Sequence, residues 1–188
     1  MPRTLAASMG LLFWCMLVIL QSVPAKAEEQ SEGARLREES ILLLQQRETA
    51  QAKELADQAL AWAKTQFGQE HIEIAEALLL LAAFESGDDR RRAAAREATA
   101  MAERVLGPRH GRLVFFLCNL ATLEGLGAET LPLIDRALAI ARDAYGEGHE
   151  ELRRAAVTKF MALSVQRRFD EARDVEKIYG LDTSPPSE

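Results

Sequence analysis

Residues 98–110 read A-T-A-M-A-E-R-V-L-G-P-R-H, and the same pattern stands at residues 59–71 (A-L-A-W-A-K-T-Q-F-G-Q-E-H) and 137–149 (A-L-A-I-A-R-D-A-Y-G-E-G-H). The three copies begin 39 residues apart, and five of their thirteen positions are identical. A fixed period of this length is typical of a chain that stacks copies of one supersecondary unit. The pattern therefore predicts a repeat architecture and leaves the chemistry open.

The segments between the copies have the periodicity of helices. Apolar residues recur at steps of three and four over residues 71–86 and 110–126, which predicts a first helix in each repeat. Asp88-Asp89 and Ala128-Glu129-Thr130 are expected to begin second helices, because acidic side chains favour the positive end of the helix dipole. No alternating strand pattern competes, so the sequence predicts an all-α fold.

Glycine and alanine have separate roles in the predicted second helices. Gly68, Gly107 and Gly146 are expected to end these helices in the left-handed conformation, which costs glycine no Cβ clash. Ala59 and Ala63 lie one turn apart, as do their copies in the next two repeats, so they should let a neighbouring helix approach closely.

Three short motifs resemble the tetratricopeptide repeats, most closely the longer subclass found in kinesin light chains. Leu106-Gly107-Pro108-Arg109-His110 is similar to the end of that subclass's second helix, Asn119-Leu120-Ala121 to its first helix, and Arg168-Phe169-Asp170-Glu171-Ala172 to the start of its second helix. The likeness covers about residues 33–181, although the period here is shorter. It implies a right-handed solenoid of antiparallel helix pairs, with about three to four units.

The predicted layout has four parts. Residues 1–27 are expected to be a signal peptide, 28–33 a short linker, 34–181 the helical repeat domain and 182–188 a flexible tail. In the first repeat, Gln45-Gln46-Arg47-Glu48-Thr49 stands where a turn is expected, but all five residues could continue a helix. A helix pair and one long helix both remain open there.

The N-terminal segment indicates export. Arg3 precedes an unbroken apolar run over residues 11–20, and Pro24 is followed by Ala25-Lys26-Ala27, a small-x-small cleavage pattern. A bilayer span needs about 20 apolar residues, so cleavage after Ala27 is preferred over a retained anchor. We expect a periplasmic or secreted protein with no stable membrane span.

The composition argues against several functions. The net charge of −6 and the scattered basic clusters are poorly suited to nucleic acid. No nucleophile elbow, phosphate-binding loop or cysteine–histidine pattern is present, so no catalytic residue and no cofactor are predicted. The clusters Arg90-Arg91-Arg92 and Arg153-Arg154 are expected to be solvated helix faces.

The histidines and the cysteine have structural and functional interpretations. His71, His110 and His149 recur at the repeat period, and helices in a stack lie about 8–10 Å apart, so a shared metal is not expected. Each should begin a helix and bond to the preceding turn. Cys118, the one cysteine left after signal removal, is interpreted as a small buried apolar residue, with a redox-active thiol as the alternative.

The resemblance also implies a concave groove lined by first helices, mainly apolar with one basic end. Asn119 resembles the family asparagine that holds a ligand's backbone amides, whereas the basic clamp some members use for a carboxylate is absent. The implied groove residues are Glu76, Leu79, Ala83, Phe115, Cys118, Asn119, Thr122, Arg154, Val157 and Met161.

Three functions follow as hypotheses. The first is an exported adaptor that binds a protein or peptide segment, as an apolar helix or extended strand, and catalyses nothing. The second is a self-assembling structural component, with homo-oligomers formed through an exposed Leu42-Leu43-Leu44 face. The third is an enzyme whose residues meet only in the folded chain.

Overall fold

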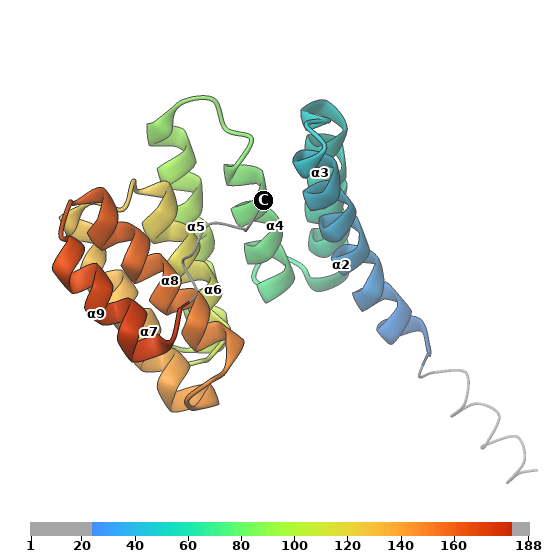
Figure 1. Cartoon of the computed structure of the whole chain (residues 1–188). Helices are drawn as coiled ribbons and strands as arrows, with labels where there is room; N and C mark the ends of the chain where they lie inside the picture. Colours follow the sequence, from blue (N-terminus) through green and yellow to red (C-terminus); the bar gives the residue numbers. More distant parts are fainter. Residues whose placement is uncertain (1–23, 182–188) are drawn as a thin grey trace, which may run out of the picture. The chain divides into compact units, whose positions relative to one another are not determined.

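The computed structural model describes residues 24–181, and every regular element in this range is helical (Figure 1). The predicted all-α class is therefore confirmed for these residues. The elements are α2 Pro24–Gln45, α3 Thr49–Phe67, α4 Ile72–Ala82, α5 Asp88–Leu106, α6 Leu113–Leu123, the short 3₁₀ helix η1 Ala128–Thr130, α7 Leu131–Tyr145, α8 Glu150–Val165 and α9 Phe169–Tyr179.

The described part of the chain divides into two compact units, with the boundary between Trp62 and Ala63. The boundary lies inside α3, and thus inside the repeat domain predicted for residues 34–181. Most of the expected signal peptide and the whole of the expected tail fall outside the described residues. Among the described helices, none combines the length and the apolar character that a membrane span requires.

The first unit is a helix pair, which resolves the alternative left open by the sequence. Arg47 has a φ of 67° and turns the chain between α2 and α3. The backbone amides of Arg47 and Glu48 donate hydrogen bonds to the carbonyl oxygens of Leu44 and Leu43, at 3.1 and 2.9 Å, and these two bonds close the turn. Residues 28–33, expected to be a linker, lie within α2 instead, because the helix begins at Pro24.

Two contacts hold the helices of the first unit together. The buried Ser40 hydroxyl donates to the carbonyl oxygen of Ala52 at 2.6 Å. A Cβ atom at Gly33 would overlap the ring of Trp62, so glycine permits the close approach of α2 to α3.

In the second unit, neighbouring helices pack on one another in chain order. α4 packs against α5, α5 against α6, α6 against α7, α7 against α8 and α8 against α9, and α6 also contacts α8. The repeated alanines Ala98, Ala102, Ala137 and Ala141 are fully buried, as their spacing predicted. Larger buried side chains, with Phe116 the largest, fill the space between the helices.

The glycines at the ends of the second helices adopt positive φ, as predicted, but not the left-handed helical conformation. The φ angles of Gly68, Gly107 and Gly146 are 84°, 86° and 79°. The ψ angles of Gly107 and Gly146 are 159° and −179°, so the chain leaves each helix extended. This combination of φ and ψ is open essentially to glycine alone.

The three histidines cap the segments that follow them. The Nδ1 atoms of His71, His110 and His149 accept from the backbone amides two residues later, at 3.2, 3.2 and 3.1 Å. The side chains thus bond to the following segment and not to the preceding turn, because extended backbone at His71 and His149 aims the ring at the next helix. The predicted bond to the preceding turn is present at His110 alone among the three, where the backbone amide donates to the carbonyl oxygen of Gly107 at 3.4 Å. The rings of His71 and His149 also stack on Phe67 and Tyr145, with centroids 3.8 and 4.3 Å apart.

Candidate binding face

The candidate site is the surface on which α4, α6 and α8 carry the residues implied by the resemblance. The name "first-helix face" is used below for this surface, defined by Glu76, Phe115, Asn119, Thr122, Arg154, Val157 and Met161. All seven belong to the second unit, and a contact between helices joins two of them, Phe115 of α6 and Arg154 of α8.

An ion pair links α4 to the start of α6. Arg112, the residue before α6, donates from Nη2 to Oε1 of Glu76. The Glu76 side chain is only 16% exposed, whereas that of Arg112 is 43% exposed. Glu76 therefore contributes to holding the helices in register, and its charge is already balanced.

The contact between α6 and α8 is a cation–π interaction. The guanidinium carbon of Arg154 lies 5.7 Å from the ring centroid of Phe115. The half-buried Phe115 ring also packs edge-on against Phe116, at 5.5 Å between centroids. Arg154 is paired with Glu151 as well, at 3.2 Å from Nε to Oε2. This geometry keeps an aromatic ring and a cation adjacent on one surface.

The polar side chains of α6 bond to their own helix. Asn119 donates from Nδ2 to the carbonyl oxygen of Phe115 at 2.8 Å, and the Thr122 hydroxyl donates to that of Cys118 at 2.9 Å. Thr122 is exposed and Asn119 is half-buried. A ligand that bonds to Asn119 through this N–H would have to replace an existing bond, which reduces the net gain.

Two implied groove residues belong to the core instead. Leu79 is 5% exposed and Cys118 is 3% exposed, so neither can contact a ligand on the surface. Burial raises the pKa of the Cys118 thiol to about 11, although a hydrogen bond with Thr158 and the charge of Arg154 oppose this rise. A thiol of such pKa is a poor nucleophile near neutral pH, which supports the interpretation of Cys118 as a small buried residue.

The exposed apolar part of the face lies on α8. Val157, Met161 and Val165 follow one another at steps of four and are 39%, 45% and 61% exposed. Arg153 and Arg154 precede this stripe on the same helix. The sequence identified Val157 and Met161 but missed Val165, whose step of four along the helix would have indicated it.

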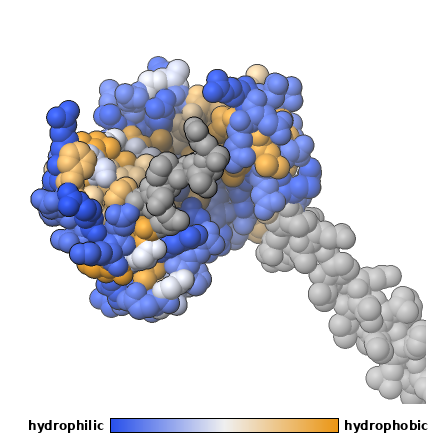
Figure 2. Space-filling view, in the orientation of Figure 1, coloured by the Kyte–Doolittle hydropathy of each residue, from blue (hydrophilic) through white to orange (hydrophobic). Residues whose placement is uncertain are grey.

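A shallow depression of about 460 Å³ lies over the N-terminal half of this stripe. In the view of Figure 2 the coloured surface is largely hydrophilic, with hydrophobic patches set among hydrophilic residues. The depression is lined by Glu150, Arg153, Arg154, Val157, Thr158, Phe160, Met161 and Leu181.

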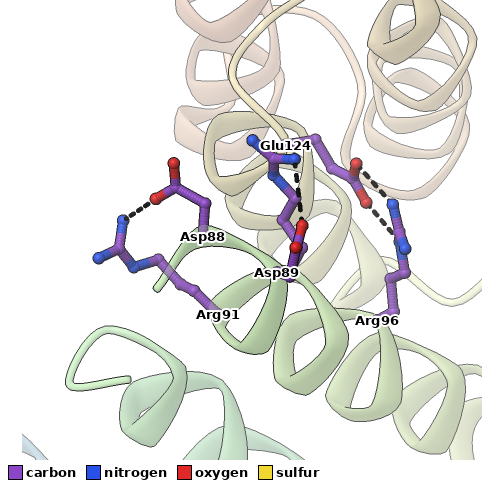
Figure 3. A network of polar contacts seen from close by, with 6 residues as sticks. Asp88, Asp89, Arg91, Arg96 and Glu124 are labelled. Atoms are coloured by element: carbon purple, nitrogen blue, oxygen red, sulfur yellow. Dashed lines mark hydrogen bonds and ion pairs between the residues drawn. The ribbon is translucent and has the colours of Figure 1, made fainter. Parts of the chain in front are cut away.

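The arginine cluster at the start of α5 differs from its prediction. Arg91 pairs with Asp88 at 3.3 Å and Arg92 with Asp89 at 3.8 Å, and both arginine side chains are 36% exposed. Figure 3 shows these pairs beside the two-bond contact of Arg96 with Glu124, at 2.5 and 2.8 Å. Arg91 and Arg92 are thus half-buried structural residues, and only Arg90 of the three is exposed.

Within residues 24–181, no group of three or more histidine, cysteine, aspartate or glutamate side chains is arranged to hold a metal ion. Neither a protein-family model nor a curated protein matches the chain. Its function has to be inferred from its own residues.

Proposed function

We propose that this chain is an exported, non-catalytic adaptor of the tetratricopeptide type, which binds a protein segment on the first-helix face. The observation that carries the proposal is the exposure of Val157 and Met161 beside Arg154, next to the ring of Phe115. Exposed apolar side chains with an aromatic anchor and a cation are the components of a peptide-binding surface.

The proposed architecture is a right-handed solenoid of antiparallel helix pairs. Its support is the packing of each helix on the next from α4 to α9, together with the direction of the contacts between α6 and α8. Phe115 meets Arg154 and, further along both helices, Cys118 meets Thr158, so α6 and α8 run the same way. First helices that run parallel are the arrangement that a stack of helix pairs requires.

The residues of the first-helix face determine which kinds of ligand would fit it. An apolar helix or extended segment would bury Met161 and Val157, and a polar or acidic group near its end would suit Arg154. Arg154 is held by Phe115 and Glu151 before any ligand arrives, so little side-chain entropy is lost on binding.

Site-specific photo-crosslinking, in cells that produce and export this protein, tests the proposal. A photoreactive side chain replaces the exposed Thr122 on the first-helix face, and a matched variant carries it at the exposed Arg90 on α5. We expect a discrete protein adduct from Thr122 and none from Arg90. No adduct at Thr122, or the same adduct at both positions, would contradict a binding role for this face.

The export proposal has its own test. Residues 1–23 lie outside the described residues, so its basis is the apolar run followed by Ala25-Lys26-Ala27. We propose a periplasmic or secreted protein processed after Ala27. N-terminal sequencing of the exported protein should begin at Glu28, whereas a full-length species extracted from membranes would show a retained anchor.

A further inference from the structure

The chain leaves α9 beside the depression on α8. Gly180, with a φ of 59°, ends α9, and the backbone amide of Leu181 donates to the carbonyl oxygen of Glu176 at 3.1 Å. α8 and α9 pack together and are joined by a short turn, so they are antiparallel and the end of α9 lies near the start of α8. Leu181 is only 8% exposed and is one of the residues that line the depression. The segment that follows Leu181 therefore starts at this depression.

The following segment and the depression carry opposite charges. Residues 182–188, D-T-S-P-P-S-E, lie outside the described residues; they include two acidic residues and no basic one, and are called the acidic segment below. The depression is lined by Arg153 and Arg154 and by one acid, Glu150. Arg154 is paired with Glu151, but no acidic side chain of the described residues forms an ion pair with Arg153. An exposed cation thus lies where an acidic segment begins.

The acidic segment is also suited to the apolar part of the depression. Each of its two prolines, Pro185 and Pro186, holds φ at about −65°, which favours an extended chain whose rings can pack on apolar and aromatic side chains. Val157 and Met161 are four residues apart, so they lie about 6 Å apart along α8. Four extended residues, the separation of Pro185 from Leu181, span about 13 Å. The prolines can therefore reach the apolar stripe.

We propose that the acidic segment docks on this depression and covers Val157 and Met161 until a ligand displaces it. This inference rests on the proposed function, because it makes the segment an internal competitor for the first-helix face. Its acids contact Arg153, and its prolines contact the apolar stripe. A competitor joined to the same chain acts at a high effective concentration, so a weak contact is sufficient. The apparent affinity for a ligand then falls with the fraction of molecules whose face is free.

A spin label on the acidic segment tests the docking without any ligand. Ser187→Cys supplies the labelling site, because Cys118 is 3% exposed and should not react in the folded protein. We expect paramagnetic broadening to weaken the backbone amide signals of Val157 and Met161 several-fold and to leave the signal of Arg90 on α5 unchanged. Arg153→Glu should restore most of the lost intensity, whereas Arg90→Glu, the matched control, should restore none.

Two results of this measurement would overturn the proposal. The first is that the signals of Val157 and Met161 are no weaker than that of Arg90. The second is broadening that appears only between copies, when a spin-labelled chain is mixed with an isotope-labelled chain that carries no spin label. In that case the acidic segment would dock on a neighbouring copy. Melting temperatures of all variants establish that they are folded.

The competition with a ligand is measured separately, through the photoreactive side chain at Thr122. In the full-length chain, Asp182→Lys combined with Glu188→Lys should raise the yield of the protein adduct about three- to tenfold, because the reversed charges release the segment from the face. Ser187→Ala, in the same segment, is the matched control and should change nothing. An unchanged yield in the charge-reversed chain would overturn the competition. Broadening at α8 without an adduct from any chain would contradict the proposed function, whereas the docking of the segment would stand.

Discussion

The connections between repeats keep the same residue types from one repeat to the next, whereas the first-helix face carries different residues at equivalent positions. Each connection runs from a large apolar residue through glycine to histidine, and in all three the histidine Nδ1 accepts from the backbone amide two residues later, although only His71 and His149 are the N-caps of helices. On the face, the residue five positions after each histidine is Glu76, then Phe115, then Arg154. Repetition within this chain therefore falls on the parts that connect and stack the helices, and variation falls on the residues that the proposed function assigns to ligand binding. The predictions below test the two groups of residues one at a time, first those that stabilise the fold and then those proposed to bind a ligand.

The largest effect should come from a connection glycine. Gly107→Val places a β-branched side chain at a φ of 86° and a ψ of 159°, which should reduce the free energy of unfolding by about 1–3 kcal/mol. No atom lies within 4 Å of the added Cβ, so the loss measures backbone strain alone. Ala100→Val, at an exposed helical position of α5, is the control and should cost about 0.5 kcal/mol. Equal losses in denaturant titrations would contradict the role of the glycine.

The capping histidines should come next. His149→Ala removes a cap and a ring stacked on Tyr145, so it should cost about 1 kcal/mol, and His149→Asn should restore part of this because asparagine also caps. His110→Ala should cost less, because Leu106 offers His110 no ring to stack on. Zinc should leave the melting temperature unchanged. A zinc-dependent rise that His110→Ala abolishes would show that the histidines bind metal instead.

A smaller effect is expected where α7 contacts α5. Arg136 donates two hydrogen bonds to Glu103, at 2.8 and 3.2 Å, and these bonds lower the pKa of the Glu103 carboxyl below its ordinary value of 4.5. Both side chains are more than a third exposed, so Arg136→Ala should cost only about 0.5 kcal/mol.

The pH dependence of this pair follows from the direction of the shift. Because the folded pKa of Glu103 is lowered, its contribution is present above the unfolded value of 4.5 and disappears as the pH falls through the folded value. The stability difference between the wild type and Arg136→Ala should therefore shrink in acid and in high salt. If this stability difference stays constant with pH, the loss in Arg136→Ala comes from the packing of the side chain and not from its ion pair with Glu103.

The sequence predicted the helices, the buried alanines and the unusual glycines, because each depends on residues close together in the chain. It wrongly placed Leu79 on the groove, and it gave Cys118 both a groove position and a buried interpretation, of which the second is right; the choice depends on how far each first helix is rotated against the next. The same limit applies to Arg91: its pairing with Asp88 is local, but its half-buried state depends on the packing around α5. The ion pair of Glu76 with Arg112 joins residues 36 positions apart and follows only from the folded chain.

The central claim is that the histidines of the connections stabilise the fold, whereas Phe115 of the first-helix face binds the ligand. Comparing one variant of each kind in a single experiment tests this claim most directly. The partner identified by crosslinking at Thr122 is titrated with the wild type, Phe115→Ala, His149→Ala and the control Arg90→Ala, each below its melting temperature. We predict that Phe115→Ala weakens binding by about 1–3 kcal/mol, while His149→Ala lowers the melting temperature and keeps wild-type affinity. Wild-type affinity in a folded Phe115→Ala variant, or an equal loss in His149→Ala, would contradict the account.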